Sequence, residues 1–197
     1  MNNNNHLMKF SRNLSSLLRH RAADYNLIIL EDGYISLNEI LKVDTKKISF
    51  KNCSIEDIIS IVDNDKKNRF SLITKNKIMY IRANQGHSNK VGNYIKDEML
   101  LTPITDPMDY CVHGTSAESA VSIKKEGLKK MERKHIHFAS SENAKSGMRY
   151  NCQMLIHCDM KSAMKDGIKF WLSENDVILS SDDIAPKYLT FVNVNNK

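Results

Sequence analysis

The sequence lacks the cysteine pattern of a metal or redox centre. Its four cysteines, Cys53, Cys111, Cys152 and Cys158, are widely or irregularly spaced, and no two of them form a C-x-x-C pair. This spacing argues against a zinc ribbon and against a thioredoxin-like dithiol. We expect four reduced, buried thiols.

The sequence also has no run of about 18 apolar residues, the length that a membrane-spanning helix needs. Met1 to His6 form an asparagine tract, which lacks the charged and apolar regions of a secretory signal. The 197 residues are 41% apolar and 26% charged, which suits one domain or two small lobes with a real core. We therefore expect a soluble intracellular protein, cytoplasmic or nuclear, with no membrane contact and a disordered start.

Negative charge is scarce in the first half. Residues 1–100 hold 16 Lys and Arg against 11 Asp and Glu, whereas residues 101–197 hold 13 against 12. A basic first half is typical of a surface that meets a polyanion such as a nucleic acid. A solvated lysine-rich surface explains the excess equally well.

The first half shows helices followed by a pair of strands. Phe10 to Arg21 has the apolar spacing of a helix, and Ser36 with Glu39 and Ser54 with Asp57 have the spacing of capping boxes. A short hairpin or strand and turn is expected around Glu31-Asp32-Gly33, and a longer hairpin over residues 69–73 and 77–82 across Lys75-Asn76. Helices followed by a two-stranded wing indicate a winged-helix module, a fold often used on nucleic acids.

Two polar stretches of this half could serve a site. Arg19, His20 and Arg21 end the first helix, where positive charge suits the helix dipole, but three neighbours cannot share one face. At least one of them should therefore point beyond the helix end. Gln85, Gly86, His87 and Ser88 follow the second wing strand and offer donors that suit a phosphate, although an ordinary loop has the same composition.

The second half is predicted to consist of short strands with two helices. Residues 97–109 are expected to connect it to the first half, and Cys111 to His113 should form a strand before a helix over 117–126, capped by Thr115 or Ser116 and ended by Gly127. Further strands are expected over residues 135–139, 153–158, 169–172, 177–180 and 188–194, with a helical turn over 160–164. The fold class of this half, and of the chain, is therefore α+β.

His135 and His137 would point to the same face of their strand. Such a pair is more often solvated or hydrogen-bonded than functional. A metal site is a further possibility, but no third or fourth ligand follows at the usual short spacing.

Taken together, the motifs resemble the RNA 2'-phosphotransferase family, from Leu14 to about Leu189. The likeness rests on several motifs in the family's order: Leu17-Leu18-Arg19-His20-Arg21, Asp32-Gly33-Tyr34, Arg69-Phe70, the run from Ile81 to Ser88, His113-Gly114-Thr115, the run from Arg133 to Ala139, and Leu172-Ser173-Glu174-Asn175. The resemblance implies a winged-helix RNA-binding lobe over residues 1–98 and an ADP-ribosyltransferase-like NAD-binding lobe over residues 99–197. Asp176 departs from the family, because glycine is frequent at this position, and the tail past Pro186 is short.

The resemblance also implies the site residues. The family's catalytic set falls on Arg19, His20, Arg69 and Arg133, with Arg82 as the alternative to Arg69. The NAD-binding positions are His113, Gly114 and Thr115, with His135 and His137 at the strand that follows, and Gln85, Gly86, His87 and Ser88 are expected to bind RNA phosphate. NAD is then a co-substrate, no metal is needed, and the partner is tRNA or another RNA with an internal 2'-phosphate. The absence of heptads favours a monomer.

The implied reaction has two steps. The RNA 2'-phosphate displaces nicotinamide from NAD, and the ribose 2''-hydroxyl then attacks that phosphate and releases ADP-ribose 1'',2''-cyclic phosphate. Arginine suits this chemistry because it makes bidentate, permanently charged contacts with phosphate. Two other functions stay open: an ADP-ribosyltransferase that modifies phosphorylated nucleic-acid ends, and an inactive winged-helix RNA-binding protein.

Overall fold

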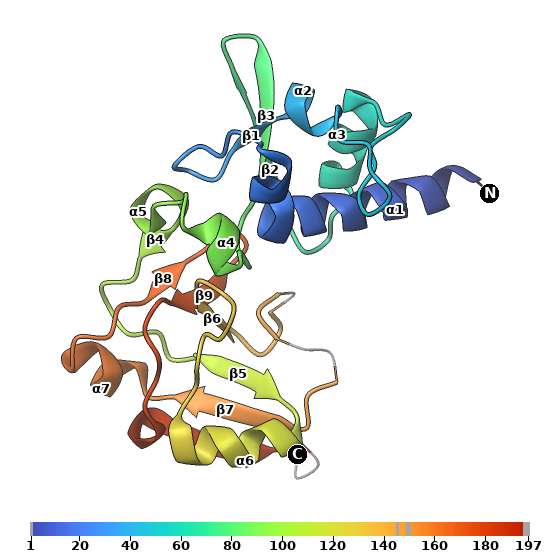
Figure 1. Cartoon of the computed structure of the whole chain (residues 1–197). Coiled ribbons are helices and arrows are strands. Elements are labelled where there is room, and N and C mark those ends of the chain that lie inside the picture. Colours follow the sequence, from blue (N-terminus) through green and yellow to red (C-terminus); the bar gives the residue numbers. More distant parts are fainter. Residues whose placement is uncertain (1, 145, 149–150, 195–197) are drawn as a thin grey trace. The chain divides into compact units, whose positions relative to one another are not determined.

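The computed structural model describes residues 2–144, 146–148 and 151–194. The chain forms two compact units, residues 1–100 and 101–197, which are labelled by element in Figure 1. The predicted boundary after residue 98 lies inside a short helix, α5 (Asp97–Leu100). The two units together contain helices and antiparallel sheets, so the predicted α+β class is confirmed.

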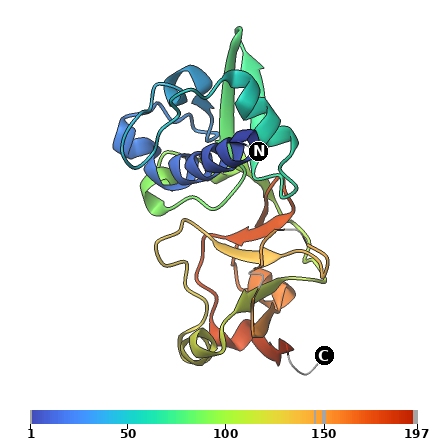
Figure 2. The same cartoon turned by 90° about the vertical axis from the view of Figure 1, so that its right-hand side faces the viewer.

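Helices and one small sheet build the first unit. The sheet has the strand order β1-β3-β2 and is antiparallel throughout. The hairpin β2–β3 projects beyond the helices in both views (Figures 1 and 2). Besides α5, the elements are α1 (Asn2–Ser16), a π-helical turn (Leu17–Arg21), a 3-10 turn (Ala22–Tyr25), β1 (Ile35–Ser36), α2 (Leu37–Ile40), α3 (Ile55–Asp63), β2 (Phe70–Lys75), β3 (Ile78–Ala83) and α4 (Asn89–Gly92).

The first helix is longer than its apolar stripe. Phe10, Leu14, Leu17 and Leu18 are buried, as their spacing predicts. The helix nevertheless begins at Asn2, so the prediction of a disordered start is wrong for the described residues. Once the buried stripe has nucleated the helix, each further residue adds a backbone hydrogen bond, and this offsets the weak helix propensity of asparagine.

The Ser54–Asp57 capping box is confirmed. The amide of Asp57 donates to Ser54 Oγ at 3.1 Å, and the amide of Ser54 donates to Asp57 Oδ2 at 2.9 Å. In α3, Ile58 and Ile61 are buried, whereas Ile55, Ile59 and Val62 are partly exposed.

The Ser36–Glu39 capping box is wrong. Helix α2 forms without a capping bond to the Ser36 hydroxyl, and the Glu39 carboxylate accepts from the amide of Ile28 at 3.3 Å. That amide belongs to the apolar stretch 27–30, the expected strand before the Glu31-Asp32-Gly33 turn, and this stretch does not join a sheet. The turn beside it does form, since Gly33 donates to the carbonyl of Leu30 at 2.8 Å.

The predicted hairpin is confirmed with its turn shifted by one residue. Lys75 pairs with Ile78, so Asn76 and Lys77 form the two-residue turn. Both have positive φ, 50° and 63°, as the turn type that suits two-residue hairpin loops requires.

A seven-stranded antiparallel sheet with the order β10-β7-β5-β6-β9-β8-β4 dominates the second unit. The predicted connection over residues 97–109 therefore includes α5 and the edge strand β4. The elements are β4 (Thr102–Pro103), β5 (Val112–Thr115), α6 (Ala117–Glu126), β6 (Ile136–Ala139), β7 (Met154–Cys158), α7 (Met160–Lys165), β8 (Trp171–Leu172), β9 (Val177–Ser180), a 3-10 turn (Pro186–Tyr188) and β10 (Leu189–Asn193).

The core of this unit lies against the middle strands. Phe138 of β6 is fully buried, and its ring lies 6.2 Å from that of Phe170 and 6.1 Å from that of His113, centre to centre. Helix α6 begins at Ser116, whose hydroxyl accepts from the amide of Ser119 at 3.2 Å, so Ser116 and not Thr115 is the cap. Gly127 follows the helix with φ of 84° and ends it as predicted.

The four cysteines are free thiols. Cys111 and Cys158 are buried as expected, but Cys53 and Cys152 are partly exposed. Desolvation raises the pKa of Cys53 to about 12, and a hydrogen bond with Cys158 and burial raise the pKa of Cys111. Neither Cys53 nor Cys111 therefore supplies a thiolate at neutral pH.

Candidate functional site

Arg19 and His20 lie in an unusual turn of the first helix. Residues Leu17 to Arg21 form a π-helical turn, in which the amide of Ala22 donates to the carbonyl of Leu17. Such turns are rare and often occur at functional sites. The buried Leu17 and Leu18 hold the turn against the core, while His20 is exposed and Arg19 is partly exposed.

The loop after β3 holds Arg19 by its backbone and by its side chain. The amide and hydroxyl of Ser88 both donate to the carbonyl oxygen of Arg19, at 2.9 and 3.2 Å. Gly86 has φ of +89°, and a Cβ built there would lie 3.3 Å from Cζ and Nε of Arg19. The guanidinium thus packs directly on the backbone of Gly86, where only glycine gives both the space and the backbone angle.

Replacing Gly86 by alanine should therefore disturb Arg19. At 3.3 Å the added methyl would push the guanidinium aside by a few tenths of an ångström. The positive φ is also unfavourable for alanine, at a cost of about 1–3 kcal/mol. We expect a lower thermal midpoint and a weakened hold on anions. Thermal unfolding with and without phosphate tests this, and Gly167→Ala, at a positive φ but with nothing within 4 Å, is the matched control.

The same loop is also bound to the chain around Arg69. The amide of Asn84 donates to the carbonyl of Arg69 at 2.9 Å, and the side chain of Asn84 donates to the carbonyl of Asn68 at 2.8 Å. Ser71 completes the set by donating to Asn84 Oδ1 at 2.7 Å. The first unit therefore brings Arg19 and Arg69, which are 50 residues apart in sequence, to one loop, residues 84–88.

The guanidinium of Arg69 is fixed by the carboxylate of Asp65, a residue outside the sequence motifs. Asp65 Oδ1 accepts from Arg69 Nε at 3.0 Å and lies 2.9 Å from Nη2. Burial by itself would raise the pKa of Asp65, but the hydrogen bonds and charge of Arg69 outweigh it and leave the pKa below its usual value. The only sequence signal is the four-residue spacing between the two.

Arg82, the alternative to Arg69, serves a different cluster. Its guanidinium lies over the ring of Tyr34 at 4.6 Å, and its Nη1 donates to the carbonyl of Asp32 at 3.2 Å. Lys75 lies 5.7 Å from the same ring and 3.3 Å from the Asp32 carboxylate. These contacts give Arg82 a role in holding the Asp32-Gly33-Tyr34 turn, and the choice of Arg69 over Arg82 as the second arginine of the site stays a prediction.

Other predicted phosphate ligands are mostly enclosed. Gln85 and His87 are buried, and Ser88 is used on the Arg19 carbonyl. The loop therefore has a structural part in holding Arg19, and its contact with RNA phosphate stays a prediction.

In the second unit, His113 bridges two strands where they separate. β5 and β6 pair only at Val112 and Ala139, and beyond that pair the His113 ring nitrogen Nδ1 lies 2.9 Å from the carbonyl oxygen of His137. An imidazole thus joins the strands in place of backbone pairing. Because this bond orients the ring, it also fixes the direction in which the other ring nitrogen, Nε2, points.

Gly114 is covered by the segment that precedes β7. A Cβ on Gly114 would lie 2.7 Å from Cγ of Met148 and 3.1 Å from Cβ of Cys152. The amide of Gln153 donates to the carbonyl of Thr115 at 2.9 Å, and Thr115 itself is buried. The spacing of residues in the sequence did not indicate that Met148 and Cys152 would cover Gly114.

The histidine pair is buried, so it is not a solvated one. The strand begins at Ile136, which leaves His135 just before it, and both His135 and His137 are largely enclosed. Arg133 lies in the connection between α6 and β6 and is exposed; its amide donates to the carbonyl of Lys130 at 3.1 Å.

The Ser173-Glu174-Asn175 turn is well ordered. Ser173 Oγ donates to Asn175 Oδ1 at 2.9 Å and accepts from the amide of Val177 at 3.0 Å, and Asn175 reaches Ser146 at 3.3 Å. Asp176 has φ of 60°, which aspartate adopts more readily than most residues. The departure from glycine is thus accommodated in the turn.

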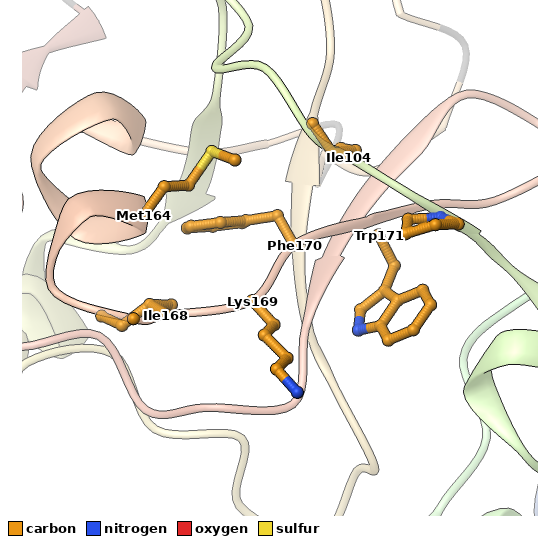
Figure 3. Close-up of a pocket in the computed structure, with 8 residues that line it drawn as sticks. Ile104, Met164, Ile168, Lys169, Phe170 and Trp171 are labelled. Atoms are coloured by element: carbon orange, nitrogen blue, oxygen red, sulfur yellow. The ribbon is translucent and has the colours of Figure 1, made fainter.

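A separate pocket of about 360 Å³ opens beside β8 and α7 (Figure 3). It contains none of the predicted site residues, and its wall is mostly apolar. The residues labelled in the close-up are Ile104, Met164, Ile168, Lys169, Phe170 and Trp171.

Within the described ranges, no three His, Cys, Asp or Glu side chains gather as a possible metal site. Among the same residues, no helix is long and apolar enough to cross a membrane.

The sequence matches known proteins over nearly its whole length. The profile described as "RNA 2'-phosphotransferase, Tpt1 / KptA family" matches residues 5–182. The chain is 35% identical over 187 residues to tRNA 2'-phosphotransferase 1 of Danio rerio, covering 90% of this chain and 80% of the relative. It is 34% identical over 194 residues to tRNA 2'-phosphotransferase 1 of Homo sapiens, covering 92% and 73%.

A relative from Schizosaccharomyces pombe is longer. It is 39% identical over 180 residues, which cover 89% of this chain and 47% of that protein. The chain therefore spans about half the length of this relative. The resemblance inferred from the motifs is confirmed: the chain belongs to the RNA 2'-phosphotransferase, Tpt1 / KptA family, and it is an enzyme of the type that the family's name describes.

Proposed function

We propose that this enzyme removes the 2'-phosphate from the splice junction of tRNA, with NAD as the acceptor of the phosphate. The products are RNA with a free 2'-hydroxyl, nicotinamide and ADP-ribose 1'',2''-cyclic phosphate. The enzyme acts as a monomer inside the cell, in the cytoplasm or nucleus. The first unit is a winged-helix lobe that binds RNA, and the second is an ADP-ribosyltransferase-like lobe that binds NAD.

In this proposal the first unit supplies the grip on the 2'-phosphate. Arg19 and Arg69 provide charged donors that match phosphate oxygens, and both are attached to the loop 84–88. His20 follows Arg19 in the same turn and is exposed, so we assign it to bind the phosphate or to donate a proton to the departing RNA oxygen. Gln85, Gly86, His87 and Ser88 complete the phosphate side.

The second unit supplies the NAD side. His113, Gly114 and Thr115 lie at the separation of β5 and β6, where the His113 ring is already fixed by the carbonyl of His137. A fixed imidazole at a break in a sheet suits the recognition of a polar dinucleotide, with His135 and His137 on the neighbouring strand. In the first step the 2'-phosphate attacks the anomeric carbon of the NAD ribose, and nicotinamide leaves.

The second step places charge on the transferred phosphoryl group. The ribose 2''-hydroxyl attacks the phosphorus, the cyclic phosphate forms, and the RNA 2'-oxygen leaves with a proton. Arg133 is assigned to this step, because a permanently charged guanidinium stabilises the added charge with little reorganisation. No metal ion is needed in the proposed steps.

The observation that carries the proposal is the attachment of Arg19 and Arg69 to one loop. Two arginines from distant parts of the sequence are each held at the backbone carbonyl by residues 84–88. Several such permanently charged side chains are what a dianionic phosphate requires. The Arg69 guanidinium is also held by Asp65, and that of Arg19 packs against Gly86, which a solvated lysine-rich surface does not require.

The test is a product assay. The protein is incubated with NAD and an oligonucleotide that carries one internal 2'-phosphate, and the products are separated by chromatography. We expect nicotinamide and ADP-ribose cyclic phosphate in equal amounts. An RNA that stays linked to ADP-ribose would identify an ADP-ribosyltransferase that stops after the first step, and RNA binding without any product would identify an inactive RNA-binding protein.

A further inference from the structure

The Asp65 carboxylate is nearly enclosed, although it is charged. Its side chain is 3% exposed, whereas that of Arg69 is 34% exposed. A buried carboxylate is costly unless hydrogen bonds compensate it. Asp65 has such bonds: besides Nε and Nη2 of Arg69, its oxygens accept from the amide of Arg69 at 2.5 Å and from that of Lys67 at 3.3 Å.

The carboxylate binds one particular edge of the guanidinium. Nε donates to Oδ1 at 3.0 Å and to Oδ2 at 3.2 Å, and Nη2 lies 2.9 Å from Oδ1. A guanidinium has five N–H donors in a rigid plane. When the Nε edge is taken, the donors of Nη1 and the outer hydrogen of Nη2 point the other way, and they remain available for a second anion.

Asp65 is itself held firmly. Its amide donates to the carbonyl of Val62 at 3.1 Å, at the end of α3, and its carbonyl accepts from the amide of Asn68 at 2.8 Å. The carboxylate therefore sits on a tight turn between α3 and β2, while the carbonyl of Arg69 is held by Asn84. Arg69 is thus fixed at its backbone and along one edge of its side chain.

We propose that Asp65 is a positioning residue for the 2'-phosphate: by binding the Nε edge of Arg69, it aims the opposite edge of that guanidinium at the phosphate. This inference rests on the proposed function. Asp65 touches neither the RNA nor NAD and acts only through Arg69. Its carboxylate also fixes in advance a side chain that would otherwise lose rotational freedom on binding, so the anion finds a ready donor pair.

The test uses Asp65→Asn in the full-length protein. Asparagine keeps one oxygen, which can still accept from the Arg69 amide. Its NH2 group in the place of Oδ1 cannot accept from Nε and Nη2 of Arg69, so the turn keeps its shortest bond while the hold on the guanidinium weakens. We expect kcat/KM for the 2'-phosphorylated oligonucleotide to fall roughly 10- to 100-fold. The dissociation constant for NAD alone should not change. Asp63→Asn, which removes the same charge at an exposed position two residues away, is the matched control and should behave as the wild type.

A double-mutant cycle separates positioning from a purely structural role. In an Arg69→Ala background, Asp65→Asn should cost no further activity, because there is no longer a guanidinium to aim. If the two losses instead multiply, Asp65 acts independently of Arg69 and the proposal is wrong. Should Asp65→Asn fail to fold, Asp65→Glu takes its place in the cycle: it keeps the charge but moves the carboxylate by one methylene.

The assays also distinguish this inference from the proposed function. If the wild-type protein forms products and Asp65→Asn is equally active, the inference about Asp65 is wrong and the proposed function stands. If the wild-type protein forms no product, its affinity for the oligonucleotide that carries the 2'-phosphate is compared with its affinity for the same oligonucleotide without it. A preference for the phosphate that Asp65→Asn abolishes supports the positioning role without catalysis, and no preference overturns both.

Discussion

Arg133→Ala is expected to stop the reaction between its two steps. Removing the guanidinium should lower the rate of the second step by about 10³-fold, the lower end of what a transition-state arginine contributes to phosphoryl transfer. The first step breaks the bond to nicotinamide and should slow much less. Nicotinamide would then appear in a burst, and RNA linked through its phosphate to ADP-ribose would accumulate. Rapid quenching followed by gel electrophoresis of labelled RNA measures this.

The control for Arg133 is Lys125→Ala. Lys125 is exposed on α6 of the same unit, so its replacement removes one positive charge without touching the predicted site. It should release both products at the wild-type rate. An Arg133→Ala variant that also released both products at that rate would remove Arg133 from the mechanism.

Arg69→Lys is expected to be nearly as damaging as a neutral substitution. The lysine ammonium is a single charged point, so it cannot bind the Asp65 carboxylate along one edge and a phosphate along the other. We expect kcat/KM to fall about 100-fold, which corresponds to about 2.7 kcal/mol of lost transition-state stabilisation. Steady-state kinetics over a range of oligonucleotide concentrations measures the loss.

The same exchange at Arg12 provides the comparison. Arg12 is exposed on α1, and Arg12→Lys keeps the charge in the same unit. It should retain wild-type kinetics and the wild-type thermal midpoint. If Arg69→Lys were as active as Arg12→Lys, a simple positive charge would suffice at position 69, and the bidentate contact would have no catalytic value.

Local patterns predicted the elements whose causes are themselves local. The Ser54–Asp57 capping box, the helix over residues 117–126 and its end at Gly127 depend on bonds between residues three or four apart, and all of them form. The hairpin β2–β3 was found, with its turn predicted one residue too early, because its strands and its turn lie within a few residues. Such features are visible in sequence because every partner is near.

The predictions failed where contacts with distant residues, present or missing, decided the structure. Glu39 has the spacing of a capping residue after Ser36, but the amide of Ile28 takes its carboxylate. The apolar run over residues 27–30 looks like a strand, yet no neighbouring strand pairs with it. Propensity is a weak prior, and tertiary contacts decide which of two feasible partners a group finds.

The residues of the candidate site likewise divide into those that sequence motifs predict and those that only the fold reveals. Motif order alone was sufficient to identify the family and to name Arg19, Arg69, His113 and Arg133, because these are properties of residue type and spacing. Asp65 and Asn84 were not predicted as site residues, because their role is to hold Arg69 and this contact depends on the fold. Gly86 was named for a phosphate, but in the structure its backbone lies against the Arg19 guanidinium.

What the sequence by itself determined, then, was chemical identity: the family, the α+β class and the types of side chain available for the reaction. Only the tertiary structure decided how those side chains are fixed, that Asp65 binds the Nε edge of Arg69, that residues 84–88 hold the backbone of both arginines, and that His113 joins two separating strands. The physical reason is that a hydrogen bond is directional and short, so its partner depends on where folding brings distant atoms together.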